Sequence, residues 1–318
     1  MPQLILGIDQ GFYKTCLAVV DQHSNIHYED YMSYFNSSGN REEKHEYIIS
    51  AILERMPQNF RKLRSIFIAT NGYLEKEYPN IFRSKGYEFE KIITFNDTHC
   101  HYGLSDMKGH CVTFANGSFS NVRYYDGHNN SLKFPNLFNN LNLNGLISGD
   151  NFSKVILEKY IDFKLKNIHS DFIAAVENYL DYDGSPIYSF VDNVINNGDK
   201  SKFIDLSRLM EDFHMIDSIS CVIADAVDKI IMLYKLFIDY TQDKEIDTII
   251  LGGSIWKYTF LSDLLKQKLM DEDDLQVKHT KILVAEGNPA LGAINFGLKN
   301  IKHYDTLTYQ TAAVNGSK

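Results

Sequence analysis

Residues 4–21 read Leu4-Ile-Leu-Gly-Ile-Asp-Gln-Gly-Phe-Tyr-Lys-Thr-Cys-Leu-Ala-Val-Val-Asp21, and this stretch decides the fold. Two short apolar runs, each ended by a carboxylate, are typical of buried β-strands, so we expect a hairpin with a glycine-bearing turn. Such a turn offers backbone N–H groups and Lys14 to phosphate oxygens, and the carboxylate of Asp9 to Mg²⁺. The alternative is an ordinary edge hairpin in which Asp9 and Gly11 serve the turn alone.

Length and charge bound the class of protein. The 318 residues are 44% hydrophobic and 23% charged, which is typical of a globular protein with room for two domains. A formal net charge of −9 without a basic tract argues against a nucleic-acid partner. No apolar run approaches the ~20 residues of a membrane span, and no secretory signal precedes the first strand. We therefore expect a cytoplasmic protein that binds no membrane.

The four cysteines form no CxxC pair, which indicates free thiols in a reducing compartment. Histidines lie beside two of them, in His99-Cys-His101 and in His110-Cys111. One interpretation is a zinc site. We favour buried thiols with surface histidines, because the spacing is not helical and no second paired half follows.

The segments after the first hairpin alternate between strand and helix patterns, which predicts a mixed α/β domain. Ligands of such sheets gather at the carboxyl ends of the strands, so Asn71, Asp97 and Asp9 are expected along one rim. Asn96 or Asp97 is the expected N-cap of the helix that follows. We predict strands at residues 25–34, 65–69 and 91–95 and a helix at residues 41–56.

A second strand–turn–strand segment, residues 110–125, repeats the pattern of the first hairpin. Its turn contains Asn116, Gly117 and Ser118. Two such turns that face each other can hold a polyphosphate from both sides. The repeat therefore indicates a duplicated core.

The second half of the chain is predicted to be mostly helical up to residue 240. Residues 217–240 have one apolar stripe at steps of three and four, which is typical of a core helix. A strand at 246–251 then leads into Gly252-Gly253-Ser254, where backbone can closely approach a flat ring. A strand at 282–285, a helix from Pro289 to about residue 301, and a polar tail at 304–318, expected to be frayed, complete the chain.

The order of these predicted strands, helices and glycine-bearing turns resembles that of the sugar-kinase branch of the actin-like ATPases. Within this branch, the N-acetylglucosamine kinase and BadF/BadG-type ATPase group is the most similar. The resemblance runs from residue 4 to about residue 298, and six motifs occur in the family's order. The family's first phosphate loop, Asp-Gly-Gly-Gly-Thr-Lys-Thr, is similar to Asp9-Gln-Gly-Phe-Tyr-Lys-Thr15, and its second, Gly-Thr-Gly-Ser, to Ala115-Asn-Gly-Ser118. The other four family motifs are similar, in chain order, to Phe95-Asn-Asp-Thr98, Gly149-Asp-Asn-Phe-Ser153, Gly252-Gly253 and Pro289-Ala-Leu-Gly-Ala293.

The resemblance implies a two-domain actin-like, ribonuclease H-like fold with an interdomain cleft, and a homodimer. Residues 1–114 would form the N-terminal domain, against which a helix at 287–303 packs, and residues 115–286 the C-terminal domain. It also implies a kinase that transfers the γ-phosphoryl group of ATP, with Mg²⁺, to a hydroxyl of a small-molecule sugar, an amino sugar such as N-acetylglucosamine.

The roles of individual residues follow from the same resemblance. Asp97 would be the catalytic base, and Asp9 would position Mg²⁺. The nucleotide would contact Asp9, Gly11, Lys14, Thr15, Asn116, Gly117, Ser118, Gly252, Gly253 and Ser254. The sugar would contact Asn71, Gly72, Asn96, Asp97, Gly145 and Asp150.

The first phosphate loop departs from the family pattern. Gln10 and Phe12 replace two glycines, and Tyr13 stands in place of a threonine. Where glycine serves positive φ or close backbone approach, these residues weaken triphosphate binding. This favours a second hypothesis, a nucleotide-binding actin-like ATPase or pseudokinase without sugar transfer.

An unrelated α/β enzyme is the third hypothesis. A 2-hydroxyacyl dehydratase activator would need cluster-ligating cysteines, and the four cysteines here provide no suitable loop pair.

Overall fold

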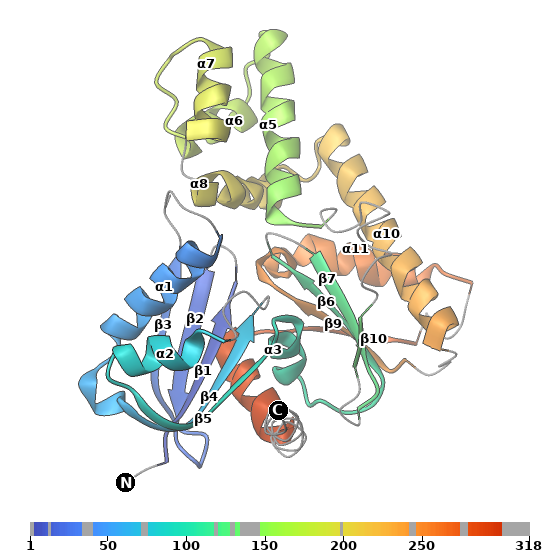
Figure 1. Ribbon diagram of the computed structural model, residues 1–318. Coiled ribbons are helices and arrows are strands. Elements are labelled where there is room, and N and C mark those ends of the chain that lie inside the picture. The colour runs from blue at the N-terminus through green and yellow to red at the C-terminus, as the bar shows by residue number, and fades with distance from the viewer. Residues whose placement is uncertain are drawn as a thin grey trace, which may run out of the picture. The chain divides into compact units, whose positions relative to one another are not determined.

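The computed structural model describes residues 3–11, 14–33, 41–70, 76–117, 120–127, 131–133, 147–197, 200–241, 246–273 and 279–300 (Figure 1). The chain divides into two compact units, Met1–Lys108 with Ala285–Lys318, and Gly109–Val284. The sequence-based boundary after residue 114 falls inside a strand of the second unit. Five sequence predictions lie outside the described residues: Asn71, Gly72, Ser118, Gly145 and the tail at 304–318.

The first unit is built on a sheet whose strand order is β3-β2-β1-β4-β5. The central strand β1 pairs antiparallel with β2 and parallel with β4, while β2 pairs antiparallel with β3 and β4 parallel with β5. The first hairpin is thus confirmed. The strands are β1 (Ile5–Gln10), β2 (Lys14–Val20), β3 (Ile26–Ser33), β4 (Lys62–Thr70) and β5 (Glu88–Asn96).

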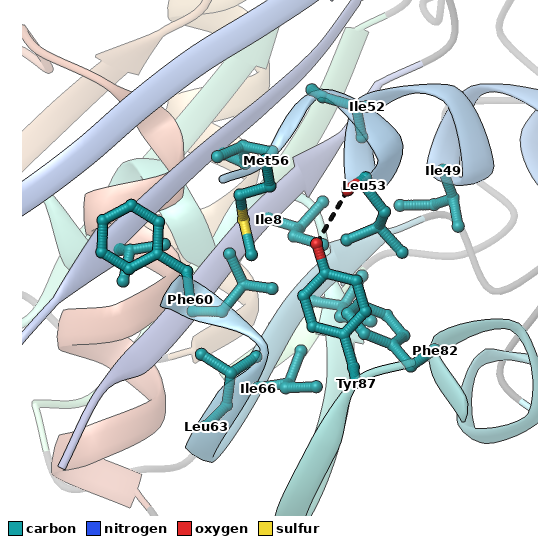
Figure 2. Close-up of a cluster of buried hydrophobic side chains, with 14 of the residues drawn as sticks. Ile8, Ile49, Ile52, Leu53, Met56, Phe60, Leu63, Ile66, Phe82 and Tyr87 are labelled. Carbon is teal, nitrogen blue, oxygen red and sulfur yellow. Dashed lines mark hydrogen bonds between the residues drawn. The ribbon is translucent and has the colours of Figure 1, made fainter. Parts of the chain in front are cut away.

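One face of this sheet carries the core shown in Figure 2. Side chains alternate between the two faces of a strand, so every second residue of β1, including Leu6 and Ile8, points to this face. Helices α1 (Arg41–Arg55) and α2 (Tyr78–Ser84) and the 3-10 turn η1 (Gln58–Phe60) cover it. The hydroxyl of Tyr87, in this core, donates to the carbonyl of Leu53 at 2.8 Å.

The other face is covered by α3 (Thr98–Gly103) and a helix at 289–300 from the end of the chain. Glycines permit this packing. A methyl group on Gly7 would lie 2.2 Å from the carbonyl oxygen of Ala290, and one on Gly292 would lie 1.9 Å from that of Cys100. Gly7 therefore brings β1, and Gly292 brings α3, into direct contact with the C-terminal helix.

The second unit repeats this topology with the strand order β10-β9-β6-β7-β8. Its central strand β6 pairs antiparallel with β7 and parallel with β9, as β1 does with β2 and β4. The predicted duplication of the core is confirmed. The strands are β6 (Cys111–Asn116), β7 (Ser120–Tyr125), β8 (Ser131–Lys133), β9 (Thr248–Gly252) and β10 (Lys281–Val284).

Helices make up most of the remaining second unit, as predicted. The predicted core helix is α10 (Asp217–Thr241), in which Ile219, Ile223 and Phe237 are buried. No helix within the described ranges combines the length and the apolar character needed to cross a membrane. The other segments are α5 (Gly149–Leu165), α6 (Asp171–Tyr179), α7 (Ile187–Asp192), η3 (Asn193–Asn197), α8 (Lys200–Asp205), η4 (Leu206–Leu209), α9 (Met210–Phe213), η5 (Ser254–Lys257) and α11 (Thr259–Met270).

Candidate functional site

Asp9 lies near the carboxyl end of β1, on the face covered by α3. It is paired across the sheet with Cys16 of β2 and Ala69 of β4, and paired residues point to the same face. Lys14 stands two residues before Cys16, so it shares this face, and its ammonium group lies 4.7 Å from the ring centroid of Tyr31. The structure therefore brings together Asp9 and Lys14, two of the predicted nucleotide-binding residues.

Asp97 precedes α3, where the chain leaves β5. Its side chain makes no capping hydrogen bond. Instead, the side-chain oxygen of Asn96 accepts from the Thr98 hydroxyl at 2.7 Å and from its backbone N–H at 3.3 Å. Asp97 therefore occupies the N-cap position, while the side-chain hydrogen bonds at the start of the helix are made by Asn96.

Cys100 connects Asp97 with Asp9. Its fully buried thiol lies 2.7 Å from the carbonyl oxygen of Asp97 and 3.6 Å from a carboxylate oxygen of Asp9. Burial, with the nearby Asp9 and Asp97 carboxylates, raises the pKa of this thiol well above its usual value. Cys100 is therefore a neutral donor beside the carboxylates.

The surroundings of Asp9 strongly disfavour its charged form. Burial, and then the negative charge of Asp97, raise the pKa of Asp9 from 3.8 to about 7, against smaller opposing effects of Cys100 and Lys14. Two carboxylates that repel each other in a partly buried place form a site that a cation would stabilise.

Thr15 does not share the face of Asp9. It follows Lys14 in β2, so its side chain points to the α1 and α2 face, where it is 0% exposed and its hydroxyl is one of the described buried groups without a hydrogen-bond partner. The prediction that Thr15 contacts the nucleotide therefore finds no support in its geometry. Gln10 points to the same buried face, so its replacement of a family glycine does not fill the Asp9 side of the hairpin.

Gly11 is needed for the hairpin turn itself. Its backbone N–H donates to the carbonyl of Lys14 at 3.0 Å, and a methyl group on Gly11 would lie 2.8 Å from that oxygen. This N–H group is therefore already hydrogen-bonded within the turn. Phe12 and Tyr13, which complete the turn, lie outside the described residues.

In the second unit, Asn116 joins three segments at the carboxyl edge of the sheet. Its side chain donates to the carbonyl of Ile147 at 2.8 Å and accepts from the indole N–H of Trp256 at 2.9 Å. Its backbone also lies against Gly253, whose φ is +103°. Asn116 and Gly253, both predicted to contact the nucleotide, thus lie against each other, and this close contact alone requires a glycine at position 253.

The other predicted residues of this edge have diverse environments. At Gly117 an added methyl group would meet no atom within 4 Å, and the Gly117 carbonyl accepts from the N–H of Gly149 at 2.9 Å. Gly252 ends β9, and Ser254 is exposed at the start of η5. Asp150, in the first turn of α5, forms an ion pair with Lys154 at 2.6 Å.

Our expectation of surface histidines beside Cys100 is wrong for His99, whereas His101 is partly exposed. His99 is buried, and its ring stacks on that of Phe296 with centroids 4.2 Å apart. Burial lowers the pKa of His101 to about 4. Within the described segments, no three histidine, cysteine, aspartate or glutamate side chains gather as metal ligands.

Comparison with solved structures identifies the architecture. A candidate N-acetylglucosamine kinase from Chromobacterium violaceum aligns over 93% of this chain and 99% of its own, with a TM-score of 0.63 and 12% sequence identity. Another from Porphyromonas gingivalis aligns over 94% and 99%, with a TM-score of 0.63 and 14% identity. The fold is that of the actin-like sugar kinases.

Other structures share this fold. A ROK family glucokinase from Streptomyces griseus, solved with glucose and AMPPNP, covers 92% of this chain and 97% of its own at a TM-score of 0.56 and 12% identity. The ethanolamine utilization protein EutJ from Carboxydothermus hydrogenoformans covers 93% and 91% at a TM-score of 0.53 and 14% identity. No protein-family model and no curated protein matches the sequence. The predicted fold class is confirmed.

Sequence reasoning missed three residues that contact predicted site residues or their neighbours within a unit: Cys100 beside Asp9, Tyr78 beside Gln10, and Trp256 beside Asn116. Cys100 could have been found, because it lies one helical turn after Asp97. Trp256 is the single tryptophan of the chain and follows the Gly252-Gly253 turn closely. No local signal pointed to Tyr78, whose partners are distant in sequence.

Proposed function

We propose that the protein is an ATP-dependent kinase that transfers the γ-phosphoryl group to a hydroxyl of an amino sugar such as N-acetylglucosamine. The observation that carries this proposal is the meeting of Asp9, Lys14 and Asp97 at one edge of the first sheet. The likeness of the fold to two candidate N-acetylglucosamine kinases, over 93% and 94% of this chain, supports the choice of acceptor.

In this reaction the sugar hydroxyl oxygen attacks the γ-phosphorus, the bond from that phosphorus to the bridging oxygen breaks, and ADP leaves. Asp97 accepts the hydroxyl proton, which is the role its carboxylate suits because it is not used to cap α3. Lys14 neutralises phosphate charge, and the edge formed by Gly117, Gly252 and Gly253 contacts the nucleotide.

Mg²⁺ fits the residues present. Asp9 offers hard oxygen ligands, and the repulsion between Asp9 and Asp97 would be relieved by a cation. Mg²⁺ is commonly held by one or two carboxylates, water and substrate phosphates, so the described residues need not supply a complete cage. When bound, it would neutralise charge on the phosphates; Asp9 would hold it, directly or through water.

The second candidate is a nucleotide-binding protein without sugar transfer. The buried hydroxyl of Thr15 and the occupied N–H of Gly11 favour it, since both remove contacts expected of a tight triphosphate loop.

A two-stage experiment separates the candidates. Thermal shift with MgATP, and with each of a panel of amino and neutral hexoses, tests binding; a ligand at a hundred times its Kd stabilises by roughly 2.7 kcal/mol. ADP release and ³¹P NMR of the sugar product then test transfer. A kinase yields a phosphosugar in amounts equal to ADP, whereas nucleotide binding without any phosphosugar favours the second candidate. Absence of both contradicts the proposal. Sedimentation of the same samples tests the homodimer that the resemblance implies.

A further inference from the structure

Four polar side chains are buried side by side at the carboxyl edge of the first sheet, on the face opposite Asp9. Gln10, Thr15 and Tyr78 are 0% exposed and Thr70 is 2% exposed. Gln10 ends β1 and is paired across the sheet with Thr15 on one side and Thr70 on the other, so the three side chains form a row. Tyr78, the first residue of α2, belongs to the core that covers this face.

The Tyr78 hydroxyl joins two members of this row, Gln10 and Thr70. It donates to the side-chain oxygen of Gln10 and also lies 3.3 Å from the hydroxyl oxygen of Thr70. Gln10 and Thr70 are the last residues of the parallel strands β1 and β4. A single phenol group thus ties together two strand ends and the start of a helix.

An apolar core would be simpler at this place. Burying a hydroxyl or an amide is unfavourable unless it is hydrogen-bonded, and a bonded pair contributes little more than apolar side chains of the same shape. The polar groups are therefore better explained by the geometry that they impose than by stability. Gln10 also stands where the resembled phosphate loop has a glycine, the residue with the greatest backbone freedom.

We propose that Gln10 and Tyr78 are a positioning pair for the first hairpin. Their hydrogen bond fixes the end of β1, and with it the neighbouring Asp9 on the opposite face, relative to the end of β4. The hairpin is thereby ordered before any ligand binds, so a ligand that contacts it does not have to order it. The inference rests on the proposed function only for its effect on nucleotide affinity.

The test compares two variants that each lose one buried phenol hydroxyl of the same unit. Tyr78→Phe removes the bond to Gln10. Tyr87→Phe is the matched control, because its hydroxyl bonds the Leu53 carbonyl within the same core (Figure 2) and touches no part of the hairpin bonding described above. Amide hydrogen exchange is measured without ligand in peptides from the β1–β2 hairpin, which contain the Gly11 N–H bonded to Lys14.

The hairpin amides are expected to exchange about tenfold faster in Tyr78→Phe, and at the wild-type rate in Tyr87→Phe. Unchanged hairpin exchange in Tyr78→Phe overturns the proposal, as does an equal increase in both variants, which would indicate general loosening. Gln10→Met, which keeps the approximate volume and removes the acceptor, must repeat the Tyr78→Phe result; if either variant does not fold, the other decides.

Nucleotide affinity provides a second readout. If the wild-type protein binds MgATP, Tyr78→Phe is expected to raise the Kd about fivefold or more while Tyr87→Phe leaves it unchanged. An unchanged Kd in Tyr78→Phe contradicts the positioning role even where stability falls. If the wild type binds no nucleotide, the proposed function fails, and hydrogen exchange alone still decides whether the pair orders the hairpin.

Discussion

Gly253 lies so close to Asn116 that a methyl group on its Cα would come within 1.9 Å of the Asn116 carbonyl oxygen. Its φ of +103° is also one that residues with a side chain rarely adopt. Gly253→Ala is therefore expected to destabilise the protein by about 2–4 kcal/mol, from backbone strain and overpacking together. Denaturant unfolding measures this.

Gly117→Ala is the matched control, since an added methyl group there meets no atom within 4 Å. Its free energy of unfolding should stay within about 0.5 kcal/mol of wild type. A loss of nucleotide affinity at unchanged stability would place phosphate against Gly117. Equal stability of the Gly253→Ala variant and the wild type would contradict the close contact with Asn116.

The Asp97→Asn variant tests whether Asp97 is the catalytic base of the proposed reaction. If Asp97 accepts the hydroxyl proton, the substitution should lower kcat by about 10²–10⁴-fold, because the amide cannot take the proton. The Kd for MgATP should change little. Steady-state kinetics and calorimetry give the two values. Asp106→Asn, at an exposed carboxylate after α3, is the control and should keep full activity. Full activity in Asp97→Asn would remove Asp97 from the mechanism.

Asp9→Asn should stabilise the ligand-free protein in a pH-dependent way. The pKa of Asp9 is raised in the folded state from 3.8 to about 7, so folding disfavours its charged form. Below pH 3.8 the carboxylate is neutral in both states; the penalty grows up to pH 7 and is constant above it. The variant should therefore gain about 1–4 kcal/mol at pH 8 and almost nothing near pH 4.

Urea unfolding of both proteins at the two pH values checks this expectation. A gain of the same size at both pH values would indicate a packing effect, and a loss of stability at pH 8 would contradict the burial of a carboxylate that is costly to ionise.

Thr15→Val should increase stability by about 0.5–2 kcal/mol, because it removes a buried hydroxyl without a partner and keeps the side-chain shape. It should leave the Kd for MgATP unchanged, in contrast to the role that the resemblance implies. Thr70→Val, on the other side of Gln10 in the buried row, loses the contact with Tyr78 and should destabilise by about 0.5–1.5 kcal/mol. A higher Kd for MgATP in Thr15→Val would show that the Thr15 hydroxyl turns toward the ligand.

The fold could be predicted from the sequence because the patterns that indicate it are local, and because the hairpin pattern occurs twice. Two hairpins with the same pattern predicted the duplicated core, and the apolar stripe of residues 217–240 predicted α10 almost to its ends. The short helix α2, seven residues long, is too brief for a periodic pattern. Helix α11 carries Leu261, Leu265 and Leu269 at steps of four and could have been predicted.

The site was only partly predictable. Alternation along β2 already implies that Lys14 and Thr15 point to opposite faces, so the loss of Thr15 from the site could have been foreseen. That the Asn96 side chain, and not that of the N-cap residue Asp97, bonds the start of α3 could not be foreseen, since both are good capping residues. The contacts of Gln10 with Tyr78 and of Asn116 with Trp256 join residues far apart in the sequence and required the structure.

The contact of Gly292 with Cys100, and of Gly7 with Ala290, has a consequence for biosynthesis. Strand β1 is translated well before the helix at 289–300 that covers one side of its sheet. The Gly109–Val284 unit is contiguous in the sequence. It can therefore fold while the other unit still lacks the helix at 289–300. Nascent chains stalled before residue 289 should therefore expose the side of β1 that carries Gly7 to chaperones, and synthesis of the helix at 289–300 should end that exposure.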